Sequence, residues 1–141
     1  MIQVTINYLA ILAVAVEVMV IGMVWYSRAV FGKKWTHLMG IKCDTKEDLK
    51  EMQKKAMPAM MASLVGSLVM AYVLVHFIQY AGAKTAMQGA LTGFWLWLGF
   101  VAPVQLTDVM FGRKKLLLWY INTGYQLVTL LIAGAILAAW V

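Results

Sequence analysis

Glu17 is the residue whose type and place most clearly allow chemistry, because it is a carboxylic acid in the middle of a long apolar run. In a membrane helix a charge at this depth costs about 2.5–3.5 kcal/mol, and such a residue usually faces the bundle interior, where it can take up a proton or a cation. The alternative is a protonated side chain that joins helices by hydrogen bonds worth about 0.6–2 kcal/mol each. Transport chemistry and a structural role both stay open.

Other polar side chains come to the depth of Glu17. With a helical rise of about 1.5 Å per residue, Tyr72 and Gln126 lie within about one turn of its level, so the three side chains can form a cluster. Four polar residues of the last apolar run share one helix face, which should not meet lipid: Asn122, Tyr125, Gln126 and Thr129. The predicted polar interior, which is either a pathway or a packing surface, consists of Glu17, Tyr72, Asn122, Gln126 and Thr129.

A second polar layer is expected nearer the cytoplasmic side, from Arg28, Gln105 and Asp108. Arg28 and Asp108 carry opposite charges and occupy equivalent places after the first and third apolar runs. They either pair across the bundle or extend separately to water at the membrane surface.

Residue patterns for enzyme chemistry are missing from the sequence. Cys43 is the only cysteine, so the chain has no internal disulfide and no paired-cysteine metal site. His76 has no second ligand at metal-binding spacing, and no glycine-rich phosphate loop precedes a helix. We therefore expect no enzyme activity, no metal and no other cofactor.

The elements that must position these side chains follow from composition. Of 141 residues, 63% are hydrophobic and 13% are charged, against roughly 45–50% and 25% in a soluble domain. The mean hydropathy is +0.79. Because one bilayer crossing takes about 20 apolar residues, we predict an all-α membrane protein with four transmembrane helices. The single integral membrane domain, residues 1–141, has spans at about 6–27, 59–80, 86–107 and 116–140.

The basic residues predict the orientation of these spans. Eight lie in the connection 28–58 and three follow the third span, whereas Lys84 alone lies between the second and third spans. Since cytoplasmic loops carry the excess of Lys and Arg, we expect a cell inner-membrane protein with both termini outside. The net charge of +6 reflects this bias, so we expect no nucleic acid partner.

The cytoplasmic connection 28–58 has a helical signal of its own. Thr45 begins a capping-box pattern, so we predict a short surface helix at about 45–57, with Pro58 opening the second span. This helix is either a solvated connector or a docking site for anionic lipid or a partner protein.

An internal repeat is suggested by two segments that follow the first and third spans. Residues 27–34 and 107–114 share a Phe-Gly-basic-basic core, at Phe31 and at Phe111. A duplication would give two similar helical hairpins related by an axis along the membrane normal, a parallel repeat. The alternative is that glycine followed by basic residues simply ends a helix well at the cytoplasmic surface.

Several short segments together resemble a known family. The chain resembles the small bacterial four-helix membrane proteins catalogued as domain of unknown function 1761, although Arg28 stands where we expect a proline. The resemblance implies the architecture and no established activity. The segments that carry it are 7–10, 25–27, 31–33, 70–73, 99–103, 121–125 and 134–138.

The sequence thus favours a small inner-membrane protein that passes or binds a small solute or ion through a polar bundle interior, as a homo-oligomer in the lipid bilayer. The alternative function is a non-catalytic membrane scaffold or partner subunit that acts through the basic cytoplasmic connection.

Overall fold

The computed structural model describes residues 3–27, 29–40 and 45–140. Within these ranges the chain is helical, without a strand. The elements are α1 (Tyr8–Trp25), α2 (Gly32–Met39), α3 (Lys46–Tyr80), α4 (Ala86–Leu96), the π-helical segment η1 (Trp97–Val101), α5 (Ala102–Phe111) and α6 (Leu116–Ala139).

Four helical stretches are long and apolar enough to cross a membrane: Tyr8–Trp25, Lys46–Tyr80, Ala86–Phe111 and Leu116–Ala139. They confirm the prediction of four membrane-spanning helices. The span boundaries differ from the predicted ones by a few residues, except that the second helix begins at Lys46 and not at about residue 59.

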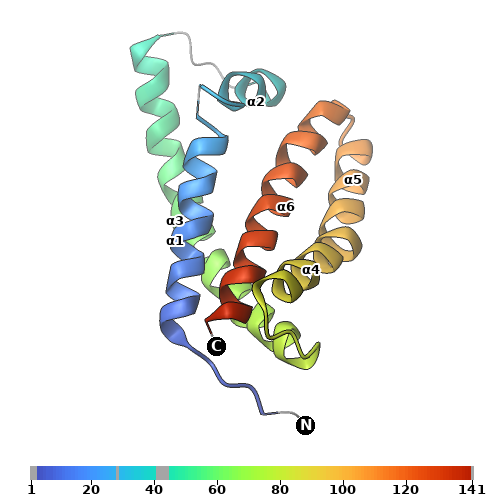
Figure 1. The fold of residues 1–141 in the computed structure, drawn as a ribbon. Helices are drawn as coiled ribbons and strands as arrows, with labels where there is room; N and C mark the ends of the chain where they lie inside the picture. Colours follow the sequence, from blue (N-terminus) through green and yellow to red (C-terminus); the bar gives the residue numbers. More distant parts are fainter. Residues whose placement is uncertain (1–2, 28, 41–44, 141) are drawn as a thin grey trace.

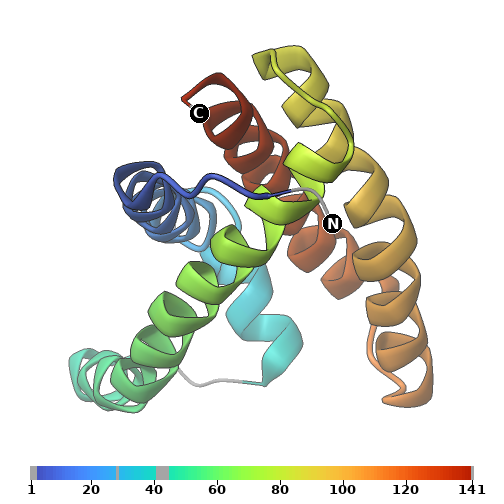
Figure 2. The same ribbon diagram turned by 90° about the horizontal axis from the view of Figure 1, so that it is seen from below.

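The four long helices form a bundle in which α6 is central. Helix α1 packs on α3 and α6, while α4 and α5 cover the other side of α6 (Figure 1). The view along the bundle shows α3 crossing diagonally below α1 and α6 (Figure 2). Both termini lie at one end, and α2 lies at the other with the start of α3, which we call the basic end (Figure 1).

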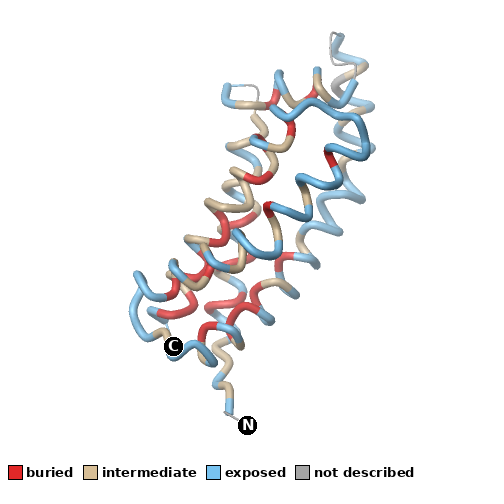
Figure 3. The backbone as a smooth tube through the Cα atoms, turned by 90° about the vertical axis from the view of Figure 1, so that its right-hand side faces the viewer, coloured by how far each residue is buried: buried red, intermediate tan, exposed pale blue. Residues whose placement is uncertain are grey.

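The buried core gathers toward the end that carries the termini (Figure 3). Residues such as Val14, Ile78 and Leu137 are fully buried there. The first residues of the chain are attached to this end, because the Gln79 amide accepts from the Thr5 N–H at 2.9 Å and the Asn7 amide donates to the Trp140 carbonyl at 3.2 Å. Toward the basic end α3 leaves the bundle, and its residues are mostly exposed.

Helix α3 corrects the prediction of a separate surface helix. The Thr45 side chain caps the helix by accepting from the Asp48 N–H at 3.1 Å, but the helix then continues through Pro58 to Tyr80 as one element of 35 residues. A proline has no N–H, so Pro58 deprives only the carbonyl of Lys54 of its helical donor. That carbonyl lies in the exposed part of α3, so water can replace the missing donor.

Helix α2 is an element that the sequence reasoning missed. It begins at Gly32, where a Cβ would collide with the Tyr26 carbonyl oxygen. Its Lys33 and Lys34 are exposed, and the ring of Trp35 meets Tyr26 edge-on at 5.5 Å. Helix α2 therefore lies across the basic end of the bundle, with an apolar side toward α1 (Figure 1).

The third span is interrupted by the π-helical segment η1. The Ala102 N–H donates to the carbonyl of Trp97, one residue beyond the usual helical partner. Pro103 follows at once, as expected for the kink that its missing N–H predicts. The indole of Trp119, on α6, donates to the Ala102 carbonyl at 2.9 Å and so attaches the kink to α6.

Helices α4 and α6 lie close together because glycines on α4 have no side chain at the contact. A Cβ on Gly89 would collide with the Gly134 carbonyl oxygen, and a Cβ on Gly93 would collide with the Leu130 carbonyl oxygen. Two glycines four residues apart allow close helix contact either within a chain or between subunits. In the structure the pair serves contact within the chain.

Candidate functional site

Glu17 lies on α1 at the edge of the face that packs into the core. Its neighbours Val14 and Val18 are buried, and the side chain of Glu17 is half-buried. Both carboxyl oxygens are shielded from solvent, yet neither has a hydrogen-bond partner among the described residues. The side chain of Tyr125, on α6, is close enough to interact with it electrostatically. Glu17 is therefore a shielded acid with unused hydrogen-bonding capacity.

In the described part of the chain, three side-chain hydrogen bonds join α1 and the following Tyr26 to residues 121–125 of α6. The Tyr125 hydroxyl donates to the Val18 carbonyl at 3.0 Å, on the turn of α1 that carries Glu17. Nearer the basic end, the Trp25 indole donates to the Ile121 carbonyl at 2.9 Å. The third bond, from the Tyr26 hydroxyl to the Asn122 amide oxygen, measures 2.8 Å.

Two glycines make room for the rings in this contact. A Cβ on Gly22 would lie 3.1 Å from the Tyr125 hydroxyl, and one on Gly124 would lie 3.2 Å from the Trp25 ring. The rings of Tyr26 and Tyr125 meet edge-on with centroids 5.4 Å apart. The aromatic cluster and its hydrogen bonds fix α1 against α6 on the basic side of Glu17.

The structure brings part of the predicted polar interior together. Asn122 takes part through its bond with Tyr26. Thr129 is buried, and its hydroxyl donates to the Gln126 carbonyl of its own helix at 3.0 Å. The half-buried side chain of Gln126 makes no hydrogen bond with the described residues. Glu17 and Gln126 are therefore not joined by a hydrogen bond.

Tyr72 lies apart from this interior. It is 45% exposed, whereas Ala71 and Val75 on the same helix are buried. Its ring packs against the His76 ring at 4.8 Å, and the His76 imidazole meets the Tyr72 carbonyl at 2.7 Å. The predicted Glu17–Gln126–Tyr72 cluster does not form among the described residues, because Tyr72 lies on the exposed side of α3 and the Glu17 carboxyl group has no hydrogen-bond partner.

The predicted cytoplasmic layer is placed only in part. Gln105 is half-buried on α5, and Asp108 is exposed near the end of that helix. The Asp108 carboxylate makes no ion pair with a described residue. Arg28, its predicted partner, lies outside the described residues, so the pair between them stays a prediction.

Sequence reasoning missed two residues of the bundle interior, Trp97 and Trp119, whose indoles both donate hydrogen bonds within it. The Trp97 indole donates to the Thr123 carbonyl on α6 at 2.8 Å. A buried indole N–H needs an acceptor, so a tryptophan in mid-span was the signal available. Elsewhere in the described ranges no group of three His, Cys, Asp or Glu side chains gathers to hold a metal.

Comparison with known proteins identifies a family but no individual related protein. Neither a curated protein nor a solved structure matches the chain. The family described as "Protein of unknown function (DUF1761)" matches residues 9–138, nearly the whole chain. On that match, together with the four apolar helices, the chain belongs to the DUF1761 family.

Proposed function

We propose that the protein is a small inner-membrane protein whose bundle interior binds or passes a small ion or solute at Glu17, as a homo-oligomer. The observation that carries the proposal is the shielded carboxyl group, whose two oxygens lack a hydrogen-bond partner among the described residues. Buried polar atoms are nearly always paired, and an unpaired one calls for an explanation, for which we propose a bound species. For a carboxylate at membrane depth that species is a proton or a cation.

The surroundings of Glu17 suit such a role. Because α1 is attached to α6 by hydrogen bonds from Trp25, Tyr26 and Tyr125, the acid is held in one place while its own oxygens stay free. A fixed acid with unsatisfied oxygens is more useful for exchange of a proton or cation than one already bonded to a neighbour.

The substitution Glu17→Gln tests this function. The probe is proton flux, followed with a pH-sensitive dye inside vesicles that contain the protein, under imposed Na⁺ or K⁺ gradients. We expect wild-type protein to carry flux above that of empty vesicles and Glu17→Gln to reduce it at least tenfold, because the amide keeps the size but cannot ionise. Tyr72→Phe is the control, since Tyr72 lies outside the interior, and it should keep the wild-type flux.

Two results would reject the function. One is wild-type flux no greater than that of empty vesicles under every gradient. The other is full flux from folded Glu17→Gln protein. With the second, Glu17→Leu should also leave the bundle at least as stable as wild type, because neither carboxyl oxygen has a hydrogen-bond partner among the described residues that the change would leave unpaired.

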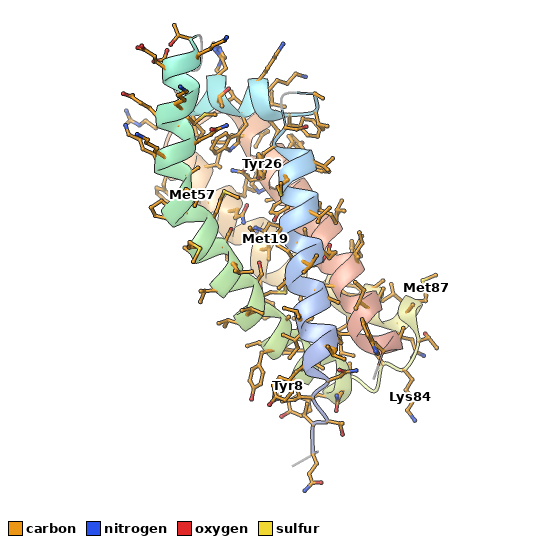
Figure 4. The ribbon with its side chains drawn as sticks, turned by 90° about the vertical axis from the view of Figure 1, so that its left-hand side faces the viewer. Tyr8, Met19, Tyr26, Met57, Lys84 and Met87 are labelled. Carbon is orange, nitrogen blue, oxygen red and sulfur yellow. The ribbon has the colours of Figure 1, made fainter. Side chains whose placement is uncertain are left out.

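The orientation forms part of the proposal. The exposed lysines of α2 and α3 and the turn at 112–115 lie at the basic end, while Lys84 lies at the end with the termini (Figure 4). The excess of positive charge in cytoplasmic loops supports a cytoplasmic basic end and outside termini.

Gene duplication is the origin that we propose for the two hairpins, α1 with α3 and α4–α5 with α6. In each shared segment the glycine N–H donates a hydrogen bond to a carbonyl just before it in the chain. Gly32 donates to the Ser27 carbonyl at 2.8 Å, and Gly112 donates to the Asp108 carbonyl at 2.9 Å. The segments also differ, because Gly32 opens α2 whereas Gly112 follows the last residue of α5.

A non-catalytic scaffold is the second candidate function. It is favoured by the exposed, charged start of α3, which projects beyond the rest of the bundle (Figure 1). A scaffold would tolerate Glu17→Gln in every assay, so the flux experiment separates the two functions.

A further inference from the structure

One face of α3 changes from basic to apolar where the helix enters the membrane. Lys46, Lys50 and Lys54 recur every fourth residue and are exposed. Residues three or four apart lie on the same side of a helix, so Met57, three residues after Lys54, and Met61, four residues after Met57, continue this face toward the bundle. The methionines are 59% and 61% exposed. We call these five residues the lysine–methionine face.

The face carries a shallow, open depression on one side of the helix, lined by Lys50, Gln53, Lys54 and Met57. The side chains of Lys50 and Lys54 make no hydrogen bond or ion pair with other described residues of the chain. The acids Glu47 and Glu51, three residues before Lys50 and Lys54, are exposed and form no ion pair with other described residues. The depression therefore offers two free cations and an amide above an apolar floor.

The depth of the face in the bilayer follows from the length of α3. A hydrocarbon core about 30 Å thick takes about 20 helical residues, or about 25 if the helix is tilted, and α3 carries no Asp, Glu, Lys or Arg from Ala56 to Tyr80. Counted along the helix from Ala56, Lys54 then lies about 3 Å beyond the hydrocarbon edge and Lys50 about 9 Å beyond it. Lysine side chains extend along the helix toward the polar layer, so both ammonium groups reach the level of phospholipid headgroups.

We propose that the lysine–methionine face binds an anionic phospholipid, with the headgroup phosphate on Lys50 and Lys54 and an acyl chain along Met57 and Met61. The joint presence of charge and apolar surface at this depth selects a lipid. A soluble acidic protein or free phosphate would use the lysines alone and leave the methionines without a role. This inference does not depend on the function proposed for Glu17.

Native mass spectrometry of the full chain in detergent tests the site, with equal amounts of phosphatidylglycerol and phosphatidylcholine that carry the same acyl chains. A lysine near an anionic surface strengthens attraction about fivefold. We therefore expect preferential retention of phosphatidylglycerol, and a drop of about 10- to 25-fold in its affinity for the double variant Lys50→Gln/Lys54→Gln. The matched control, Lys114→Gln/Lys115→Gln, removes the same charge from the basic end outside the site and should change the affinity less than twofold.

A second pair of variants tests the apolar part. Met57→Asn should weaken retention of phosphatidylglycerol about threefold, whereas Met87→Asn, at an exposed methionine of the opposite end (Figure 4), should leave it unchanged. All these side chains are exposed, so the variants should keep the wild-type helical content and melting temperature in circular dichroism.

Three results would overturn the proposal. Equal retention of phosphatidylcholine would remove the charge selectivity, and equal losses from the two double-lysine variants would indicate diffuse attraction without a site. Competition by glycerol phosphate as strong as that by the lipid would assign the lysines to a free phosphate compound instead.

Discussion

Main-chain carbonyls that already belong to helices accept most of the hydrogen bonds between α1 and α6. The Trp25 indole and the Tyr125 hydroxyl both donate to such carbonyls, at Ile121 and Val18. A carbonyl oxygen has two lone pairs, so it can keep its helical partner and accept a second donor. These contacts thus stabilise the bundle without a polar side chain on the accepting helix, and such acceptors leave no trace in a sequence.

The value of one such bond can be measured with Trp25→Phe. This change keeps an aromatic ring but removes the donor, and we expect a loss of about 0.6–2 kcal/mol in the free energy of unfolding. Trp95→Phe is the control, because Trp95 is 65% exposed and its indole makes no hydrogen bond with the described residues. Reversible unfolding in mixed micelles gives both values, and equal effects of the two substitutions would contradict the assigned role of the Trp25 indole.

At the residue scale, the sequence allows a prediction of depth along a helix but not of direction around it. Counting residues places Glu17, Tyr72 and Gln126 near one level, but it says nothing about the side of the helix on which each lies. A helix that is apolar all round has no polar stripe to mark its outer side, and α1 is of this kind. The outward position of Tyr72 follows only from the burial of Ala71 and Val75 in the core.

The elements differ in how closely they are packed. Helix α4 meets α6 backbone to backbone at Gly89 and Gly93. The following η1 and α5 pack less closely against α6. The sequence predicted the third span, because its apolar run is long, but the π-helical turn depends on the contacts with α6. Likewise the sequence placed Pro58 at the start of a helix, since proline is favoured in a first turn, although the structure has it inside α3.

A side chain at Gly89 should separate α4 from α6. We expect Gly89→Val to lower the free energy of unfolding by about 1–3 kcal/mol or more, because the added atoms meet the main chain at Gly134 and not a flexible side chain. Gly66→Ala is the control, since nothing lies within 4 Å of the Cβ it adds. That variant should be neutral or more stable, by up to about 1 kcal/mol. A well-tolerated Gly89→Val would show that the helices are not in such close contact.

At the scale of the whole molecule, charge and packing are distributed in opposite ways. The buried core lies toward the end with the termini (Figure 3), and most of the exposed basic residues lie at the other end. The uneven charge was predictable from the sequence, because it depends only on which loop holds each lysine. The uneven packing was not, because the splay of α3 away from α1 and α6 depends on the angle between helices.

Labelling of single cysteines in intact cells measures the orientation. With Cys43 replaced by serine, a cysteine at position 84 should react with a membrane-impermeant maleimide from outside, because Lys84 belongs to the loop that carries one basic residue. A cysteine at position 50 should react only after the membrane is made permeable. The reverse pattern would refute the proposed topology.

Because α3 is one continuous helix, a small rotation at its buried part produces a larger displacement at its exposed start. Its buried positions begin at Ser67, while residues 46–66 form a mostly exposed arm that extends about 32 Å at 1.5 Å per residue. A rotation of about 10° near Ser67 would move the tip at Lys46 by roughly 5–6 Å, since displacement grows with distance along a rigid helix. A small change of tilt within the core is therefore amplified at the basic end, where the lysines of α3 lie.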